Sequence, residues 1–418
     1  MELRTNIIYL LLFSFTFSAN AEFVSKSTTN PPALMNLNYQ DLLENRMDLK
    51  KGKPEIVSSY NNLIIKANSI LKIDPMKVID GVLPPSGNKN DFFTIAKYAW
   101  PNTKTSDGMP YYTRDGMINP ESAGDNYDLN RYDKTVFNIS TLTLAWFYSE
   151  DDKYANKASE LLRVWFNDPK TRMNPNFNCA GALPGVYNAT PSGIIYGVAL
   201  INMIDYVNIL SMSNRWTTQD NELLKSWFKE YTDWLLTSEF GIKESKTTNN
   251  HSVWYSAQVA TFAIYNGNIE LAKSMIQKGK LQLSQQVADD GSLPRELGRK
   301  QSFHYSLYGI KPFCTLACCA HIIGEDLWNF QTSNGKSLKL ALDFILPYIV
   351  KEKLWKWPNE GSYDSEDDRL NSISFIRTAA KALKTDKLIN AENYIISIFP
   401  KDFDKAWLQG RKTDSSKN

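Results

Sequence analysis

Apolar residues that recur every three or four positions are the feature that most constrains this chain. The pattern begins in residues 133–166 and continues, in segments separated by short polar turns, almost to the C-terminus. This spacing is the period of an amphipathic α-helix, whereas strand-like alternation is scarce. The further predicted helices cover residues 193–211, 217–239, 250–266, 269–286, 302–323, 337–351, 368–383 and 387–399.

Consecutive helices without a detectable sequence repeat favour two all-α architectures, a superhelical solenoid or a closed α/α toroid. Two long stretches rich in Gly, Pro and Asn, residues 79–133 and 167–192, favour the toroid. Loops of this length in a compact domain are usually functional, and these carry Lys, Arg, Asn, Tyr and Trp. We therefore expect an all-α fold, an incomplete α/α barrel of helical hairpins, with the long loops over a substrate groove at one mouth.

The first 21 residues have the pattern of a secretory signal peptide. Arg4 precedes an apolar run from Ile7 to Phe17, and a small-x-small cleavage site ends at Ala21. No cysteine near this site could accept a lipid, and no later apolar run approaches the about 20 residues that span a bilayer. No linker divides the rest of the chain. Residues 22–418 are therefore predicted to be one domain of a periplasmic or secreted monomer without a membrane span.

Charge and cysteine usage narrow the function classes. The 47 Lys and Arg against 45 Asp and Glu leave a balance of +2, too small an excess to indicate a nucleic-acid partner. Cys314, Cys318 and Cys319 crowd one apolar stretch beside His321, and no second pair of metal ligands occurs elsewhere. Buried thiols and a core histidine are the favoured interpretation, while a disulfide from Cys179 stays open in an oxidising compartment. We expect no metal site and no required cofactor.

A histidine stands at the head of the helix predicted for residues 250–266. Asn249 or Asn250 is a good N-cap, which puts His251 in the first turn. The positive end of the helix dipole disfavours an imidazolium there, so the neutral form that a proton acceptor requires is favoured. From these residues alone, an asparagine cap beside a half-buried histidine explains the segment equally well.

A second cluster of candidate residues lies at residues 291–313, around the start of another predicted helix. Arg299 and Tyr305 are close in sequence, and a nearby cation lowers the pKa of a phenol below its usual value of about 10. Glu296 paired with Arg299 or Lys300 would be an ordinary surface ion pair. Tyr305 is therefore the candidate proton carrier.

Several of these motifs together resemble the alginate-lyase domain of bacterial polysaccharide lyases. They occur in the family's order over more than half of the chain, which makes the resemblance more specific than any single motif. It implies an α/α toroid with its active site in a groove or tunnel. The motifs are NNHSVW (249–254), RELGRKQSFHYS (295–306), TRMNPNFNCAGALPGV (171–186), PSGNKNDFFTIAKYAWP (85–101) and YTRDGMINPE (112–121).

The resemblance also implies roles for single residues. Asn250 and His251 match the family's catalytic Asn-His pair, Arg299 its carboxylate-binding arginine and Tyr305 its catalytic tyrosine. The candidates for binding flanking sugars, by charge pairing and stacking, are Lys89, Trp100, Tyr112, Arg114, Arg172, Trp254 and His304.

Two motifs depart from the family pattern. Where many relatives read Gly-Asp-Lys-His-Asp-Tyr, residues 87–92 read Gly-Asn-Lys-Asn-Asp-Phe, so a sugar-binding histidine is replaced by Asn90. Cys179 and Gly181 stand where longer polar residues are frequent. Both departures leave the preferred polymer open.

β-Elimination in a 4-linked uronate removes the C5 proton and expels O4, so the adjacent carboxylate must be neutralised first. Asn250, His251 and Arg299 are donors suited to that carboxylate. Tyr305 could act as base and then acid where C5–H and O4 share a face, as in mannuronate. Where they lie on opposite faces, as in guluronate, His251 would be the base. The predicted function is a lyase for an acidic polysaccharide, alginate rich in mannuronate, with β-1,4-glucuronan as the alternative.

Two other function classes stay open from the sequence. An α/α-barrel glycoside hydrolase would need two carboxylates as acid and base or nucleophile, and Asp91, Asp115 and Glu296 are available. A non-catalytic uronate-binding protein would keep the arginines and aromatic residues without needing Tyr305. Product absorbance separates a lyase from both, because only elimination leaves a C4–C5 double bond.

Overall fold

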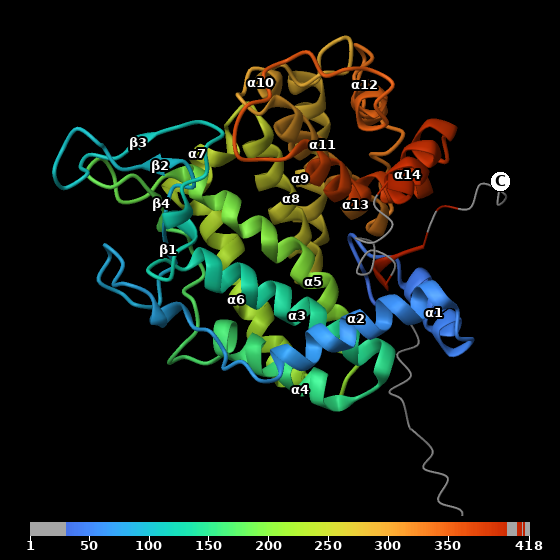
Figure 1. Cartoon of the computed structure of the whole chain (residues 1–418), viewed down its shortest axis with the longest axis horizontal. Helices are drawn as coiled ribbons and strands as arrows, with labels where there is room; N and C mark the ends of the chain where they lie inside the picture. Colours follow the sequence, from blue (N-terminus) through green and yellow to red (C-terminus); the bar gives the residue numbers. More distant parts are fainter. Residues whose placement is uncertain (1–30, 399–407, 412, 414–418) are drawn as a thin grey trace, which may run out of the picture. The chain divides into compact units, whose positions relative to one another are not determined.

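The inner layer of the fold is built from five helices that pack on one another in chain order. They are α3 (Leu129–Ser149), α5 (Val198–Leu210), α8 (Asn250–Tyr265), α11 (Ser302–Ile322) and α13 (Ser365–Leu383) (Figure 1). The computed structural model describes residues 31–398, 408–411 and 413, so the predicted signal peptide at 1–21 lies outside it.

An outer layer of helices covers this inner layer. Helix α4 packs on α3, α6 and α9 pack on α8, α12 packs on α11, and α14 packs on α13. Because inner and outer helices alternate along the chain, the predicted all-α toroid of helical hairpins is confirmed. The outer helices are α2 (Pro54–Ile70), α4 (Asp152–Leu162), α6 (Thr218–Thr237), α9 (Ile269–Gln286), α12 (Leu338–Ile349) and α14 (Asp386–Ile398).

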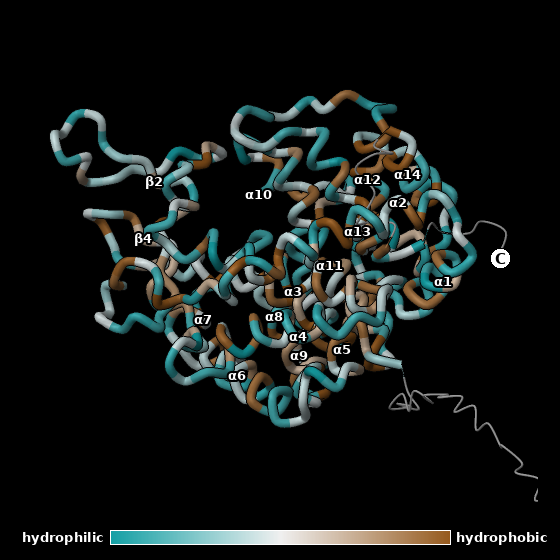
Figure 2. The backbone as a smooth tube through the Cα atoms, turned by 60° about the horizontal axis from the view of Figure 1, so that its bottom comes forward, coloured by the Kyte–Doolittle hydropathy of each residue, from teal (hydrophilic) through white to brown (hydrophobic). Residues whose placement is uncertain are grey.

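Helices α8 and α11 are buried over most of their length. Nearly every residue of α8 is buried, polar ones such as Ser256 and Gln258 included, because the helix lies between inner and outer neighbours. A helix covered on all sides needs no polar face. Figure 2 accordingly shows hydrophobic stretches along the packed helices, whereas the loop that carries β2 is mainly hydrophilic.

The helices predicted from periodicity end within a few residues of the observed ones. The prediction missed four helices, of which α7 and α10 are too short to display a period, and α1 has only three buried residues. The missed helices are α1 (Tyr39–Lys50), α2, α7 (Glu239–Ser245) and α10 (Pro294–Leu297). Short helical turns complete the order: η1 (Val78–Asp80), η2 (Pro120–Ala123), the π-helical η3 (Arg163–Asn167) and η4 (Pro191–Gly197).

The two long loops are joined to each other by short strands. Strand β1 (Phe93–Ile95) of the first loop pairs in parallel with β4 (Cys179–Ala182) of the second, and β2 (Ala99–Trp100) pairs antiparallel with β3 (Tyr112–Thr113). Figure 1 shows the β2–β3 hairpin at the edge of the helical layers. Gly181 has φ +73°, and a Cβ there would lie 2.8 Å from the Thr190 side chain. The departure from the family pattern at Gly181 is therefore a requirement of the backbone.

All four cysteines are free and buried, which confirms the buried-thiol interpretation. His321, predicted to be core, is exposed instead because it lies at the last turn of α11. The expectation that no apolar run approaches membrane-spanning length is also wrong. By length and composition alone, Pro191–Leu210 qualifies among the described residues, with 67% of the stretch buried inside the fold.

Candidate active site

A buried carboxylate closes the N-terminus of α8. Glu296 Oε1, from α10, accepts hydrogen bonds from the backbone N of Asn250 at 2.8 Å and from its Nδ2 at 2.9 Å. Asn249 occupies the N-cap position but its side chain makes no capping bond. Glu296 is 2% exposed, so the predicted surface ion pair is wrong. The carboxylate instead satisfies an unpaired N–H group at the positive end of the helix.

His251 lies in the first turn of α8, as predicted, and is oriented by a second buried carboxylate. Its Nδ1 is 2.5 Å from Glu244 Oε1, and Glu244, from α7, is 2% exposed. With Nδ1–H donated to Glu244, Nε2 of the half-buried ring carries the free lone pair. The arrangement can therefore present a base at Nε2 or, when protonated, a donor.

Arg299 is held by Asp115, which sequence reasoning did not place there. Arg299 Nε lies 3.2 Å from Asp115 Oδ2, and its Nη2 makes a second, shorter bond to Oδ1. The hydrogen bond from Arg299 lowers the pKa of Asp115. Burial lowers the pKa of Arg299, but the bond to Asp115 and the neighbouring Tyr305 outweigh it, so that the pKa is raised and the cation persists. The guanidinium carbon lies 3.6 Å from the centre of the Tyr305 ring.

Tyr305 is at one end of a row of three tyrosines, in which each hydroxyl contacts the next. Its hydroxyl hydrogen-bonds that of Tyr98, and the Tyr98 hydroxyl lies 3.2 Å from that of Tyr363. Burial raises the pKa of Tyr305 to about 12, although Arg299 and the Tyr98 hydroxyl act to lower it. The expectation of an easily lost phenolic proton is therefore wrong in its net direction, because Tyr305 is only 7% exposed.

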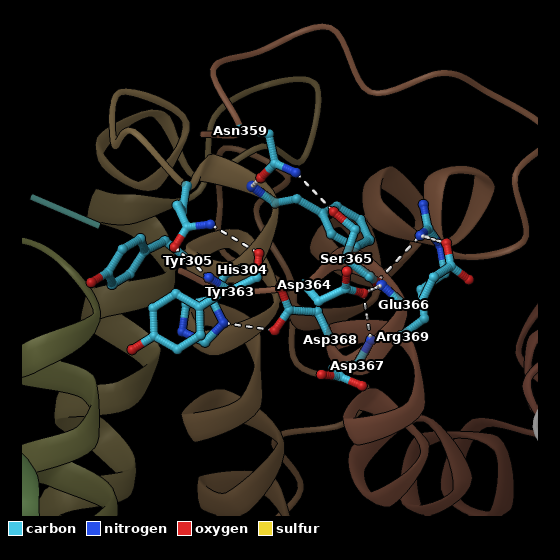
Figure 3. Close-up of polar contacts among 12 residues, drawn as sticks. His304, Tyr305, Asn359, Tyr363, Asp364, Ser365, Glu366, Asp367, Asp368 and Arg369 are labelled. Atoms are coloured by element: carbon cyan, nitrogen blue, oxygen red, sulfur yellow. Dashed lines mark hydrogen bonds and ion pairs between the residues drawn. The ribbon is translucent and has the colours of Figure 1, made fainter. Parts of the chain in front are cut away.

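His304 supports this row of tyrosines from behind. Its ring stacks on Tyr363 with centroids 3.6 Å apart, and its Nδ1 bonds Asp368 Oδ1 at 2.7 Å, as Figure 3 shows. Asp368 lies in the first turn of α13. These two contacts tie α11 to the Tyr363 segment, and substrate binding by His304 stays a prediction.

Three of the predicted sugar-binding residues gather on the β2–β3 hairpin. The Arg114 guanidinium lies 4.9 Å from the centre of the Trp100 ring, and Trp100 Nε1 donates to the carbonyl of Met117 at 2.9 Å. Tyr112 is 44% exposed on the adjacent strand. The aromatic face of Trp100, the phenol of Tyr112 and the cation of Arg114 therefore lie together on one hairpin.

Lys89 and Arg172 belong to two loops that are tied together. Asn90 Nδ2 donates to the carbonyl of Arg172 at 2.7 Å, so the residue that replaces the family's histidine joins the loops. Lys89 is exposed and Arg172 is half-buried. Trp254, in contrast, is 1% exposed and packs on Tyr308, so its prediction as a sugar-binding residue is wrong. It points into the layer between helices because it lies one turn deeper than His251 on α8.

The carboxylates that a hydrolase would need are engaged elsewhere. Asp115 binds Arg299, Glu296 binds Asn250, and Asp91 accepts from Asn174 Nδ2 at 2.7 Å. Among residues 31–398, 408–411 and 413, no group of three or more His, Cys, Asp or Glu side chains is arranged to hold a metal ion.

Comparison with known proteins gives one family and a set of similar structures. The sequence model of the alginate lyase family matches residues 80–355. An alginate lyase from Bacteroides ovatus is 28% identical, with a TM-score of 0.78 over 92% of this chain and 97% of that one. A variant of alginate lyase A1-III complexed with a tetrasaccharide is 15% identical, with a TM-score of 0.50 over 78% of this chain and 88% of that one. No curated protein matches.

Proposed function

We propose, from the premise that the chain belongs to the alginate lyase family and is a polysaccharide lyase, that it cleaves 4-linked polyuronates by β-elimination. The first-choice substrate is alginate rich in mannuronate, and the products carry 4,5-unsaturated uronate ends. The substrate class is an acidic polysaccharide, which agrees with the cations Arg299, Arg114 and Lys89 on and around the candidate site.

The observation that carries this proposal is the contact set of Tyr305. Its ring lies against Arg299 and its hydroxyl against Tyr98. A phenolate forming at Tyr305 would be stabilised by the guanidinium and by the Tyr98 hydroxyl as donor. This pairing of a proton carrier with a fixed cation is what removal of a proton next to a carboxylate requires.

In the proposed reaction Tyr305 moves one proton. Its phenolate oxygen takes the proton from C5, the C5–H electron pair becomes the C4–C5 double bond, and the C4–O4 bond breaks. The phenol then returns the proton to O4 when O4 lies on the same face of the sugar. Arg299 and protonated His251 donate to the uronate carboxylate as negative charge develops there. Asn250 acts through its second amide hydrogen, since the first binds Glu296.

β-1,4-Glucuronan is the second candidate substrate. It is favoured by Asn90, which stands in place of the family's sugar-binding histidine and bonds Arg172. C5–H and O4 lie on the same face in glucuronate as in mannuronate, because the two sugars differ only at C2, so Tyr305 would act as base and then acid on this polymer as well. On a sugar with C5–H and O4 on opposite faces, such as guluronate, His251 Nε2 would take the proton and Tyr305 would donate to O4. The Nδ1 contact with Glu244 suits this role because it leaves Nε2 as the acceptor.

The experiment that tests the function is absorbance at about 235 nm, where the C4–C5 double bond formed by elimination absorbs. Polymannuronate, polyguluronate and glucuronan are each mixed with wild-type protein and with Tyr305→Phe. Growth of absorbance on one polymer, lost in the variant, would establish the substrate. Equal rates in both proteins would refute the role of Tyr305, and no growth on any of the three would refute the substrate class.

We also propose that the protein is exported to the periplasm or medium after loss of residues 1–21. The proposal comes from the charged, apolar and small-residue pattern of that segment alone. N-terminal sequencing of the protein recovered outside the cytoplasm should begin at Glu22. A first residue of Met1 would contradict it.

A further inference from the structure

One cavity of the molecule has none of the four predicted catalytic residues in its lining. It has a volume of about 980 Å³, and its lining includes residues of α3, α5, α11 and α13. Lys311, in this lining, and Tyr305 are both on α11, and the six positions from one to the other correspond to about 9 Å along the helix axis. The cavity is therefore offset along α11 from Tyr305.

Most charged groups that line this cavity are compensated. Lys381 binds Asp41, Arg377 binds Glu392, and Asp205 accepts three backbone N–H bonds from residues 35–37. Each of these charged groups has an ion pair or hydrogen bonds within the protein, so these side chains contribute to the packing of the toroid.

Lys311 is the exception among the described residues that line the cavity. No ion pair or side-chain hydrogen bond with a described residue engages its ammonium. Burial lowers the pKa of Lys311. Enclosing an ammonium without an anion costs free energy. An anionic ligand bound beside Lys311 would remove this cost.

Two further side chains give the cavity the character of a sugar site. Phe137, on the inner face of α3, is 48% exposed, although it lies inside the toroid. Asn202, on α5, is exposed, lines the cavity and accepts a hydrogen bond from Asn36 at its Oδ1. An aromatic face, an amide and a cation are the groups that together bind a hydroxylated ring with a carboxylate.

A short link connects the rim of this cavity with the candidate active site. Asp133, on α3, lines the cavity, and the charge of Lys97 acts to lower its pKa against the larger raising effect of burial. The Lys97 ammonium in turn lies 5.2 Å from the centre of the Tyr363 ring. A small product released beside Tyr363 would therefore stand close to the cavity rim.

We propose that this cavity is a second ligand site for a sugar acid of one or two units, with its carboxylate at Lys311 and a ring face on Phe137. The identity of the ligand as a uronate rests on the proposed function, whereas the anion site rests on the cavity itself. Its volume is at the upper end for small-molecule sites.

Calorimetric titration with mannuronate monomer, which has no bond to cleave, tests the proposal. Arg299→Gln reduces binding at the catalytic cluster, and Lys311→Met removes the cavity cation at similar volume. We expect Lys311→Met to weaken cavity binding at least tenfold, while Arg299→Gln and the exposed-site control Lys353→Met leave it within twofold. Neutral mannose should bind neither the wild-type protein nor Lys311→Met. Thermal unfolding of Lys311→Met should occur at or above the wild-type temperature, because an uncompensated buried charge is gone.

A second variant keeps the proposal testable if Lys311→Met does not fold. Phe137→Leu keeps the cation and removes the ring, and should weaken mannuronate several-fold without changing the response to inorganic phosphate. Mannuronate binding lost only in Arg299→Gln would overturn the proposal, as would equal affinity for mannuronate and phosphate. Failure of the proposed function is distinguishable, because absorbance would then stay flat on every polymer while cavity binding persisted.

Discussion

At the scale of single residues, each of three side chains of the candidate site is held by a partner from another element. Tyr305 contacts Tyr98, His251 contacts Glu244, and Arg299 contacts Asp115. Each partner constrains the side chain whose role we infer, so substitution of a partner should change turnover more than substrate affinity.

The Tyr98 hydroxyl should stabilise the phenolate form of Tyr305. A hydrogen bond to a charged group contributes about 1.5–3 kcal/mol, so Tyr98→Phe should lower kcat by about tenfold to a hundredfold with little change in KM. Steady-state absorbance kinetics measure both constants. Tyr363→Phe removes the next hydroxyl of the row and is the matched control. It should lower kcat only a few-fold. A Tyr98→Phe enzyme with wild-type kcat would exclude this role.

The pH dependence of turnover should report on Tyr305 as the base. Burial raises its pKa to about 12, so at neutral pH the phenolate is a minor species whose fraction grows tenfold per pH unit. kcat/KM on polymannuronate should therefore rise between about pH 7 and about pH 9 with a slope near one. A flat profile over this interval would contradict Tyr305 as base, since a phenol that acts only as acid is fully protonated there.

Glu244 should act as a positioning residue for His251. Glu244→Gln keeps the shape but removes the charge that fixes the imidazole, and losses of about tenfold to a hundredfold are typical of such partners. We expect a lower kcat and an altered pH profile, measured with the same absorbance assay. Asp368→Asn removes the equivalent carboxylate beside His304 and is the control, expected to cost less than threefold. Equal losses in both would assign Glu244 a purely structural role.

At the scale of elements, the residues after Pro358 connect the Asp115 loop with the start of α11. Glu360 N donates to the Lys300 carbonyl at 2.8 Å, and Ser362 N donates to the Gly116 carbonyl at 2.8 Å. Figure 3 shows the adjoining residues, from Asn359 to Arg369, beside His304 and Tyr305. Three segments far apart in sequence therefore fix the backbone around Arg299.

Gly116 is where this junction should be most sensitive. It has φ +75°, and a Cβ there would lie 3.1 Å from Gln301 Cγ. Gly116→Ala should cost about 1–3 kcal/mol of stability and, by moving Asp115, several-fold in kcat. Gly267→Ala is the control, since Gly267 has φ +77° with nothing within 4 Å of its Cβ. Thermal unfolding and steady-state kinetics of both variants test this. Equal losses of stability and of kcat in the two variants would show that only backbone strain is responsible.

At the scale of the whole molecule, chain segments near both ends are tied to α13. Asp41, in α1, binds Lys381 in α13 and accepts from the backbone N of Arg411 at 2.7 Å. Glu392, in α14, binds Arg377 at 2.9 Å and accepts from Thr413 N at 3.1 Å. These buried or half-buried bonds stabilise the part of the toroid that the inner-layer contacts of α3 do not reach.

Asp41→Asn should weaken this connection. It leaves the mostly buried Lys381 ammonium without its anion, and removing one partner of such a pair costs about 1–3 kcal/mol where it is partly solvated. We expect a lower unfolding temperature with unchanged kcat. Asp233→Asn is the control, because the Lys229–Asp233 pair is exposed on both sides and contributes little. An Asp41→Asn protein as stable as wild type would contradict the inferred role.

The sequence by itself determined the helical class, the positions of the long helices from α3 onward and the candidate catalytic residues. Helical period and capping are local, since they depend on residues within a turn or two. Asn250, His251, Arg299 and Tyr305 lie at or near helix starts that the pattern predicts, so their approximate placement followed from local order.

Only the tertiary structure decided which partner each of these residues has. Glu244, Asp115, Tyr98 and Glu296 come from other elements, and no local pattern encodes a contact across 46 to 207 positions such as Asn250–Glu296 or Tyr98–Tyr305. Burial likewise depends on what packs around a side chain, which is why the pKa of Tyr305 is raised and why Trp254 belongs to the core. Period and motif are short-range properties, whereas electrostatics and burial are properties of the assembled fold.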